Sequence, residues 1–450
     1  MTIFKAYDIR GTYPDQIDAD AAQRIGHAFA RHIGRGAVVV GHDMRTMAGE
    51  IHAACIDGIR AAGLDVIDIG LASTPQTYFA TASLEASGGI AITASHNPAG
   101  YTGFKMTREQ AIPISADSGL KAIEALSAEP VARAARPGGL RSVDTLTDYA
   151  SHVCRWADLA RPVRIASDAA NGMAAHTFPR ILEALPDIEH HGLYYELDGT
   201  FPNHEANPLK QSNLRDLQAL VGRTGAELGA AFDGDADRCC FVDDRGRALG
   251  NDIITALVAE RVLAEEPGAA IVYDLRSSWI LPKTVLAAGG RPEKERVGHS
   301  FLKARMRACN APFGGELSGH YYFRDNWFAD NSEIILLCVL GILSRSERSL
   351  AEHADQLLQF HSTGEVNFEV DDKQAAIERL RQAFPRARTD MLDGITLATG
   401  EVDDADWWWV NVRPSNTEPL LRMTLEARTP ERMQQMQARV IEIIGVDPQD

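Results

Sequence analysis

Short apolar runs rich in β-branched residues alternate with amphipathic stretches in the first part of the chain. Residues 37–40 form an apolar run that predicts a buried strand, and residues 50–62 follow with the pattern of a helix. Residues 64–69 predict a second strand, 75–85 a helix, and 88–92 a third strand. This alternation indicates βαβ units and a largely parallel sheet.

The same alternation returns twice further along the chain. Residues 163–166, 193–197 and 228–232 predict three strands with helices between them. Residues 269–273 and the segment around Arg296 and Val297 predict two more. The repetition predicts further α/β units of the same kind.

The last part of the chain has a different order of elements. Its pattern predicts strand, helix, strand, strand and helix at residues 365–370, 374–383, 407–412, 420–427 and 430–444. Two strands in direct succession are typical of antiparallel pairing, so we expect an α+β module here.

Three segments interrupt these patterns and are candidate domain boundaries. Residues 127–142 are rich in Pro, Gly and Arg, residues 245–250 read RGRALG, and a third boundary falls near residues 360–364. A chain of 450 residues is too long for one hydrophobic core, which agrees with several domains. The predicted domains are residues 1–142, 143–246, 247–361 and 362–450.

Charge and composition narrow the classes of function. The formal net charge of -17 argues against binding to nucleic acid or to an anionic membrane, although a locally basic cleft could still bind an anionic substrate. The six cysteines include no CxxC pair, which favours reduced thiols. Because the chain has neither an apolar leader nor a run of about 18 apolar residues, we expect a cytoplasmic protein.

The segment TASHNP, which contains Ser95, directly follows the predicted strand at residues 88–92. Ligands of open α/β sheets gather at the carboxyl ends of strands, so Ser95 is a candidate nucleophilic or phosphorylated serine. The alternative is a turn that the Ser and Asn side chains stabilise. A hydrolase elbow requires GxSxG, and Thr93 and Asn97 stand where its glycines would be.

Three aspartates, Asp233, Asp235 and Asp237, alternate with small residues after the apolar run at residues 228–232. In an extended loop their carboxylates can point to one centre, and oxygen ligands in that number suit Mg²⁺. The EF-hand pattern fails, because its required Gly and Glu are missing. A solvated acidic turn is the alternative, but three crowded carboxylates repel one another without a cation.

Two further segments have the residue types of a sugar-phosphate site. In GGELSGH, Glu316 and Ser318 alternate and can hold adjacent sugar hydroxyls, while the glycines allow close approach of a ligand. In RPSNTEP, Arg413 offers a planar fork for phosphate, and the following turn adds hydroxyl and N–H donors. The alternatives are a glycine-rich hairpin and a polar turn. Weaker single candidates are Tyr7, Arg10, Lys105, Gly298, His299, Ser300, Lys303 and Arg305.

Together, TASHNP, DGDADR, GELSGH and RPSNTEP, in this order and spacing, resemble the α-D-phosphohexomutase family over essentially the whole chain. The N-terminal FKAYDIRG is similar to its bacterial phosphomannomutase/phosphoglucomutase branch. The resemblance implies an α/β fold: three α/β domains of similar topology with mixed sheets, plus a C-terminal α+β lid domain, around a central cleft. It also implies a monomeric enzyme that interconverts hexose 1-phosphate and hexose 6-phosphate, of mannose and/or glucose.

The resemblance assigns roles to individual residues. Ser95 matches a phosphoserine whose phosphate joins Asp233, Asp235 and Asp237 around Mg²⁺. A hexose 1,6-bisphosphate would form, turn round in the cleft and return its other phosphate to Ser95. The residues that match transfer-assisting positions, besides Ser95, are Arg10, Lys105, Arg238 and His299. The residues that match substrate-binding positions are Tyr7, Arg276, Gly298, His299, Glu316, Ser318, Gly319, His320, Arg413, Pro414, Ser415, Asn416 and Thr417.

One position departs from the family pattern. This chain has Asp274-Leu-Arg276 where family members often carry Lys, and Arg and Lys differ in shape and hydration, so sugar preference can be affected. Three other functions stay open at this point: a phosphoglucosamine mutase, a metal-dependent phosphatase with an Asp nucleophile, and a non-catalytic sugar-phosphate-binding protein.

Overall fold

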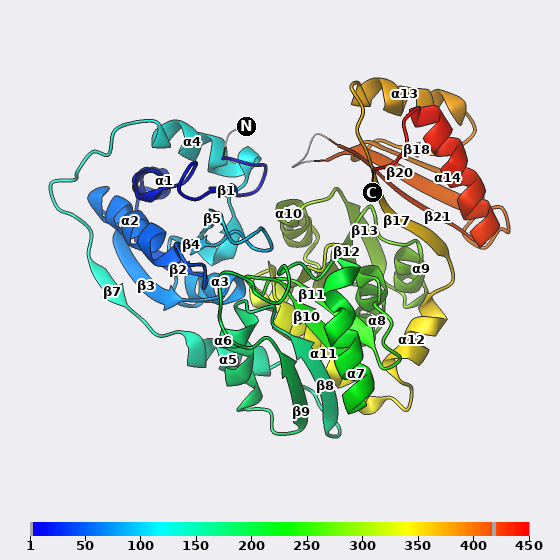
Figure 1. The fold of residues 1–450 in the computed structure, drawn as a ribbon, viewed down its shortest axis with the longest axis horizontal. Coiled ribbons are helices and arrows are strands. Elements are labelled where there is room, and N and C mark those ends of the chain that lie inside the picture. The colour runs from blue at the N-terminus through cyan, green and yellow to red at the C-terminus, as the bar shows by residue number, and fades with distance from the viewer. Residues whose placement is uncertain (1–2, 416–419, 450) are drawn as a thin grey trace.

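The computed structural model describes residues 3–415 and 420–449, which form four sheets with helices packed on them (Figure 1). In the first, seven-stranded sheet, β2 (Ala37–His42), β3 (Asp65–Leu71) and β4 (Gly88–Ile92) run parallel, which confirms the predicted βαβ pattern. Strand β5 (Tyr101–Arg108) runs antiparallel to β4 and to β1 (Ile9–Thr12). The other elements are β6 (Ile112–Pro113), β7 (Leu140–Ser142), α1 (Ala19–Ile33), α2 (Ala48–Ala61), α3 (Thr74–Ser83) and α4 (Lys121–Ser127).

The second sheet has the order β11-β10-β8-β9. Its strands are β8 (Val163–Asp168), β9 (Ile188–Leu193), β10 (Leu228–Phe232) and β11 (Cys239–Asp243), and its helices are α5 (Leu146–Cys154), α6 (Ala174–Leu182) and α7 (Arg215–Thr224). The prediction of a strand at residues 193–197 is wrong for most of that range, because β9 ends at Leu193. The backbone of Tyr194 turns left-handed there (φ 57°), which breaks the extended conformation despite the apolar side chains that follow.

The third sheet has the order β13-β12-β14-β15-β16. Its strands are β12 (Ala270–Asp274), β13 (Arg291–Glu295), β14 (Phe313–Gly315), β15 (Tyr321–Phe323) and β16 (Ala329–Asp330); its helices are α8 (Asn251–Glu265), α9 (Ile280–Ala287), α10 (His299–Cys309), α11 (Ser332–Arg345) and α12 (Leu350–Leu357). The strand expected around Arg296 and Val297 lies earlier, as β13. That strand is the edge of the sheet and reads RPEKE, so it has no apolar pattern to reveal it.

The C-terminal domain, which we define as the fourth sheet with α13 and α14, is antiparallel throughout, as predicted. Its elements are β17 (His361–Phe368), α13 (Lys373–Ala383), β18 (Arg388–Asp390), β19 (Ile395–Thr399), β20 (Trp408–Pro414), β21 (Leu421–Ala427) and α14 (Pro430–Ile444). The sequence pattern missed β18 and β19. Short helical segments lie at Glu109–Ala111, Ala116–Leu120, Gln211–Leu214 and Arg324–Asn326.

The hydrophobic cores divide the molecule differently from the sheets. The second and third sheets share one core, in which Phe178 and Phe232 belong to the same cluster as Ile271, Phe313 and α11. The first sheet and the C-terminal domain have cores of their own. Two sheets therefore form one packed body, with the first sheet on one side and the C-terminal domain on the other (Figure 1).

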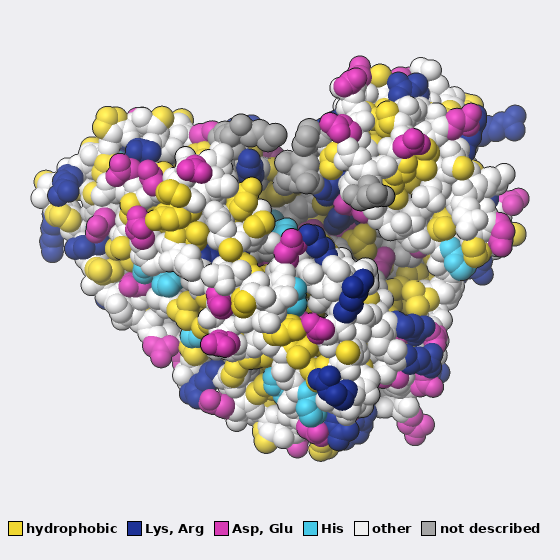
Figure 2. Space-filling model, viewed as in Figure 1, with side chains coloured by type: hydrophobic (Ala, Val, Ile, Leu, Met, Phe, Trp, Pro, Cys, Tyr) yellow, Lys and Arg dark blue, Asp and Glu magenta, His cyan; other side chains and the backbone are white. Residues whose placement is uncertain are grey.

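A hollow opens between the first sheet and the C-terminal domain, above the shared core (Figure 2). Side chains from three parts of the molecule line a cavity of about 410 Å³ there: Tyr7 from the segment before β1, Phe301 from α10, and Asp393 and Pro414 from the C-terminal domain. The described part of the chain contains no helix with the length and apolarity that crossing a membrane requires. All six cysteines are free thiols, as predicted.

Candidate functional site

Ser95 lies on a tight loop just beyond the carboxyl end of β4. Its backbone is left-handed (φ 51°), which is unusual for a residue with a side chain, and its N–H donates to Thr93 Oγ1 at 2.9 Å. The Ser95 hydroxyl donates to Asp233 Oδ2 at 2.8 Å. The loop therefore directs the serine oxygen at the first of the three aspartates.

The three aspartates form one buried cluster after β10. Ligand oxygens of Asp233, Asp235 and Asp237 lie within 4.8 Å of one another, and each residue is at most 2% exposed. Asp233 Oδ1 accepts the backbone N–H groups of Asp237 (3.1 Å) and Arg238 (3.2 Å), which closes the loop. The predicted convergence of the carboxylates is present in the structure.

This donor set fits Mg²⁺. Asp235 Oδ1 is buried without a hydrogen-bond partner, which costs free energy unless a cation takes its lone pairs. Asp237 Oδ1 is also buried, and lies 3.4 Å from His320 Nε2 and 3.9 Å from Arg238 Nε. Hard carboxylate oxygens are the ligands that Mg²⁺ prefers. Burial raises the pKa of Asp233 well above its usual value, and the charges of Asp235 and Asp237 raise it further. A cation would relieve this repulsion.

Lys105, on β5, supplies positive charge to the same cluster. Its ammonium donates to Asp235 Oδ2 at 2.6 Å and also to Asp237 Oδ2. Burial lowers the pKa of Lys105, but the two carboxylates outweigh burial and leave that pKa above its usual value. Lys105 is therefore a protonated partner of the aspartates in this structure.

Arg45 holds the serine loop and was missed by the sequence reasoning. Its buried guanidinium donates to the carbonyl oxygens of Ser95 (2.9 Å), Asn97 (2.7 Å), Pro98 (2.8 Å) and Tyr101 (3.1 Å). Asp43 Oδ2 accepts from its Nε at 3.2 Å. The signal was available: a polar GHDMR segment follows the strand at 37–40, and parallel neighbours end at the same edge of a sheet.

Arg10 and Arg238 flank the cluster from two sides. Arg10 donates to Asn97 Oδ1 at 2.5 Å and to Asp8 at 2.7 Å, so it also supports the serine loop. Arg238 Nε lies 3.6 Å from Asp233 Oδ2 and 3.4 Å from His320 Nε2. Arg238 thus links the aspartates to the sugar-loop candidates.

The GELSGH segment is both a hairpin connection and part of the site. It joins β14 to β15, and Ser318 Oγ donates to Glu316 Oε2 at 2.8 Å and lies 3.1 Å from His320 Nδ1. Tyr322 donates to the other oxygen of Glu316. Gly319 adopts φ 87°, which allows the tight turn. The two interpretations of this segment are therefore compatible.

Tyr7, Gly298 and His299 meet on the wall of the hollow. The Tyr7 hydroxyl donates to the carbonyl of Val297 at 3.0 Å, and the Tyr7 and His299 rings contact edge to face at 5.4 Å. A Cβ on Gly298 would lie 2.5 Å from the Tyr7 hydroxyl, so this approach requires glycine. His299 stacks near His320 at 6.1 Å between ring centres, and burial lowers its pKa well below the usual value.

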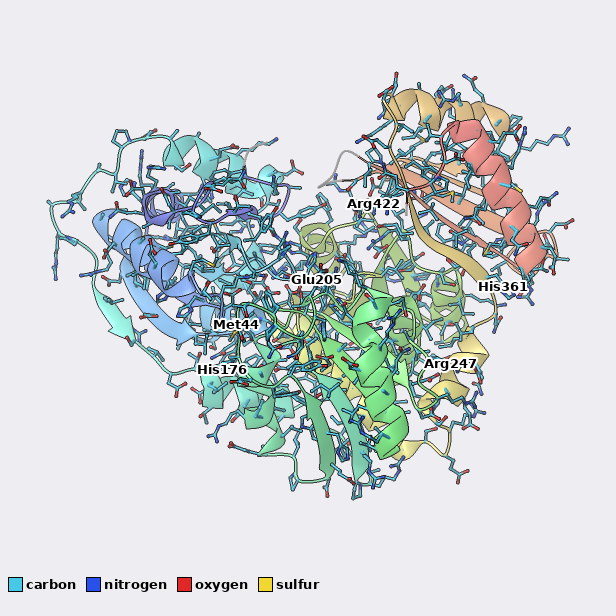
Figure 3. All side chains as sticks on the ribbon, in the orientation of Figure 1. Met44, His176, Glu205, Arg247, His361 and Arg422 are labelled. Atoms are coloured by element: carbon cyan, nitrogen blue, oxygen red, sulfur yellow. The ribbon has the colours of Figure 1, made fainter. Side chains whose placement is uncertain are left out.

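Arginines gather at the other end of the hollow. Arg413, at the end of β20, and Arg422, on β21, lie opposite each other, and Arg422 lies on the side of the C-terminal domain that faces the other sheets (Figure 3). Arg276 comes from the third sheet, where Asp274 accepts from its Nε and Nη2, both at 3.0 Å. Pro414 lines the cavity, and Ser415 donates its N–H to Leu420. Asn416 and Thr417 lie outside the described residues.

A continuous series of polar contacts joins the two ends. From Ser95 it runs through Asp233, Arg238, His320, Ser318, Glu316, Arg276 and Glu365 to Arg413. The structure thus joins most of the described candidate residues in one network of contacts, and adds Arg45, Glu365 and Asp330 to them. Arg305 lies apart from this network, because its exposed side chain pairs with Glu293 on β13. Asp330 lies 3.8 Å from His320 and 2.7 Å from the buried ammonium of Lys303.

Comparison with known proteins covers nearly the whole chain. Four family profiles, described as phosphoglucomutase/phosphomannomutase alpha/beta/alpha domains I, II and III and C-terminal domain, match residues 1–132, 144–246, 250–360 and 365–443. A protein named "Phosphohexose mutases" from Xanthomonas campestris pv. campestris (strain B100) is 41% identical over 434 residues, 95% of each chain. An Escherichia coli phosphomannomutase is 38% identical over 459 residues, 99% of each chain.

Solved structures of phosphoglucomutase/phosphomannomutase proteins have a similar fold. A phosphoglucomutase/phosphomannomutase family protein from Burkholderia thailandensis superposes with a TM-score of 0.90 at 34% identity and covers 100% of both chains. A putative phosphomannomutase from Thermus thermophilus has the same fold, with a TM-score of 0.81 at 23% identity over 98% of both chains. With four profiles in order along the chain, the protein belongs to the phosphoglucomutase/phosphomannomutase family.

Proposed function

We propose that this protein interconverts hexose 1-phosphate and hexose 6-phosphate, of mannose and/or glucose, through a phosphoserine at Ser95. One observation carries the proposal: Ser95 Oγ lies 2.8 Å from an aspartate cluster at one end of a cleft, and Arg413 and Arg276 lie at the other. A monophosphorylated sugar has one phosphate for the arginines and one free hydroxyl for the serine. The family membership supports the same reaction.

Asp233, Asp235 and Asp237 would hold Mg²⁺ together with an oxygen of phospho-Ser95. When bound, the ion supplies charge stabilisation for the transferring phosphoryl group. Arg238 lies 3.6 Å from Asp233, and its guanidinium would stabilise the negative charge of the same phosphoryl group. Arg45 and the left-handed backbone of Ser95 fix the direction of the serine oxygen, so that transfer needs little reorganisation.

Glu316 and Ser318 would bind adjacent sugar hydroxyls, because their oxygens lie 2.8 Å apart. A base must remove the proton of the attacking hydroxyl. Lys105 and His299 are the candidates; the lowered pKa of His299 keeps its imidazole neutral and able to accept a proton, whereas Lys105 is protonated and engaged by two carboxylates.

The reaction proceeds through a hexose 1,6-bisphosphate in this proposal. After the first transfer the ligand has a phosphate at each end and must turn round, so that its other phosphate returns to Ser95. Contacts made to hydroxyls and phosphates suit both orientations. Closure of the C-terminal domain over the hollow would exclude water, which otherwise hydrolyses the phosphoserine.

The test is an assay of the mannose, glucose and glucosamine 1- and 6-phosphate pairs with trace bisphosphate, for wild type and Ser95→Ala. We expect interconversion of the mannose or glucose pair, loss of it in Ser95→Ala, and a phosphoserine at position 95 in the intact protein by mass spectrometry. Undiminished turnover in Ser95→Ala would refute the mechanism. Equal or greater activity on the glucosamine pair would refute the substrate assignment.

We propose further that the enzyme works in the cytoplasm as a monomer. The six free thiols support a reducing compartment. Light scattering on the purified protein tests the second point: a mass near 49.0 kDa is expected, and a mass near twice that value would contradict it.

A further inference from the structure

The carboxylate of Glu365 lies among the three arginines at the basic end of the cleft. Its Oε2 is 3.1 Å from Arg413 Nη2 and 3.5 Å from Arg276 Nη1, and its Oε1 is 3.1 Å from Arg422 Nη1. Arg276 comes from the third sheet and the other two from the C-terminal domain. A single acidic side chain therefore connects two bodies of the molecule at the point where a phosphate is expected.

The backbone presents Glu365 at the mouth of this arginine group. The pairing of β17 with β21 shifts register between Ser362 and Glu365, and Gly364 adopts φ 65° with no atom within 4 Å of a built Cβ. The Glu365 side chain is 27% exposed, whereas that of Arg413 is 3% exposed. The carboxylate of Glu365 is thus the more exposed partner of this ion pair.

A carboxylate pairs with guanidinium groups in the same planar, charge-assisted geometry as a phosphate, but it has fewer oxygens and less charge. We propose that Glu365 occupies the site of the non-transferred phosphate when no substrate is bound, and that the substrate phosphate displaces it. This inference rests on the proposed function, since it takes the Arg413 end to be that phosphate site.

Displacement has a consequence for turnover. The bisphosphate must leave the arginines and return the other way round. A carboxylate attached to β17 stays near the arginines, and it replaces the departing phosphate without any diffusion. Glu365 therefore weakens the binding of phosphate and in return speeds its exchange.

Titration of the full-length protein tests the competition without turnover. Inorganic phosphate and glucose 6-phosphate are the probes, measured by calorimetry for wild type, Glu365→Gln and Glu365→Asp. If the carboxylate occupies the site about nine-tenths of the time, Glu365→Gln should bind each probe about tenfold more tightly. Glu365→Asp keeps the charge but shortens the reach, so it should shift in the same direction. Unchanged or weaker binding in Glu365→Gln overturns the proposal and makes Glu365 a support for the arginines.

A matched control is Glu369→Gln, which removes the same charge four residues on, where the side chain accepts from Gln449. It should bind the probes as wild type does; equal tightening in this variant would mean that net charge alone is responsible. Turnover gives a second readout: Glu365→Gln should lower KM and kcat together, because release of the phosphate becomes slower. If wild type does not interconvert hexose phosphates, the proposed function fails, while the phosphate titration still decides the role of Glu365.

Discussion

The cleft has an acidic end, formed by Ser95 and the three aspartates, and a basic end, formed by Arg276, Arg413 and Arg422. The two ends hold their charges in different ways. At the acidic end, backbone contacts join the first and second sheets: the N–H of Thr74 donates to the carbonyl of Asp235, and a Cβ on Gly234 would meet the carbonyl of Ser95 at 2.5 Å. At the basic end, the charged groups of the third sheet and of the C-terminal domain meet through side chains, as in the pair of Arg276 and Glu365.

Backbone packing fixes positions, whereas a partly exposed carboxylate such as that of Glu365 can leave its guanidinium partners when another anion takes its place. The acidic end is therefore built for the transfer of a phosphoryl group, which requires alignment of the reacting atoms. The basic end is built for a ligand that must bind, leave and bind again.

Removal of divalent cations should affect the acidic end alone and give the largest effect. Three buried carboxylates repel one another, and Asp235 Oδ1 has no hydrogen-bond partner, so we expect treatment with EDTA to lower mutase turnover by about a thousandfold, or ~4 kcal/mol. Addition of Mg²⁺ should restore it. In the same samples, calorimetric binding of inorganic phosphate at the basic end should hardly change. Full activity in EDTA would contradict the metal assignment.

The attachment of the C-terminal domain should depend on pH through Glu426. This buried carboxylate accepts from Ser278 Oγ (2.6 Å), the N–H of Trp279 (3.1 Å) and Trp409 Nε1 (2.8 Å), and burial raises its pKa to about 7. Since the folded-state pKa lies above the unfolded value, its stabilising contribution is complete below about pH 4.5 and is lost as pH rises through 7. The loss should reach ~3 kcal/mol.

Hydrogen exchange of β20 and β21 against pH measures this loss. Glu426→Gln should flatten the pH dependence of their opening free energy. Burial also raises the pKa of Glu333, in the shared core, to about 7. Glu333 is present in both wild type and Glu426→Gln, so its effect cancels when the opening free energies of the two proteins are subtracted. The same pH slope in wild type and Glu426→Gln would show that the domain is held elsewhere.

Arg45→Lys tests whether the serine loop is fixed by its four carbonyl contacts. A lysine keeps the charge but cannot donate to four carbonyls in the fork geometry of a guanidinium. A displacement of Ser95 of about 1 Å should lower kcat about a hundredfold, or ~2.7 kcal/mol, with KM unchanged. Steady-state kinetics and circular dichroism on the same samples separate this effect from unfolding. A KM increase at constant kcat would assign Arg45 to substrate binding.

The sequence predicted that Ser95 and the three aspartates meet at the acidic end, because these residues lie in short motifs directly after buried strands. Ser95 and the three aspartates needed only the rule that ligands gather at the carboxyl ends of strands. Arg45 obeys the same rule, so its place at this edge of the sheet was predictable, but its partners lie 50–56 positions away and only the structure shows these contacts.

The basic end was predicted less well for a physical reason. Arg413 stands in a recognisable turn, but Glu365 belongs to an ordinary strand, and its position depends on a register shift and on the placement of a separate domain. The fold shows the same division. Buried strands such as β2 and β10 have apolar patterns, while the edge strand β13 and the short β18 have little apolar surface to bury and were misplaced or missed. Strand β19 is an exception, because it is buried and was missed as well.

Arg276→Lys should have the smallest effect on catalysis, because it introduces the residue that family members often carry. Arg276 uses one edge of its guanidinium on Asp274 and another nitrogen on Glu365. A single ammonium cannot keep both contacts, so KM for the hexose phosphates should rise by up to about tenfold, or ~1.4 kcal/mol, while kcat changes little. Arg247→Lys is a matched control: Arg247 also pairs with an aspartate, Asp243, but it is far from the cleft (Figure 3). If KM for the mannose and glucose pairs is the same in Arg276→Lys as in the control, an ammonium at this position binds the substrate as well as the guanidinium does.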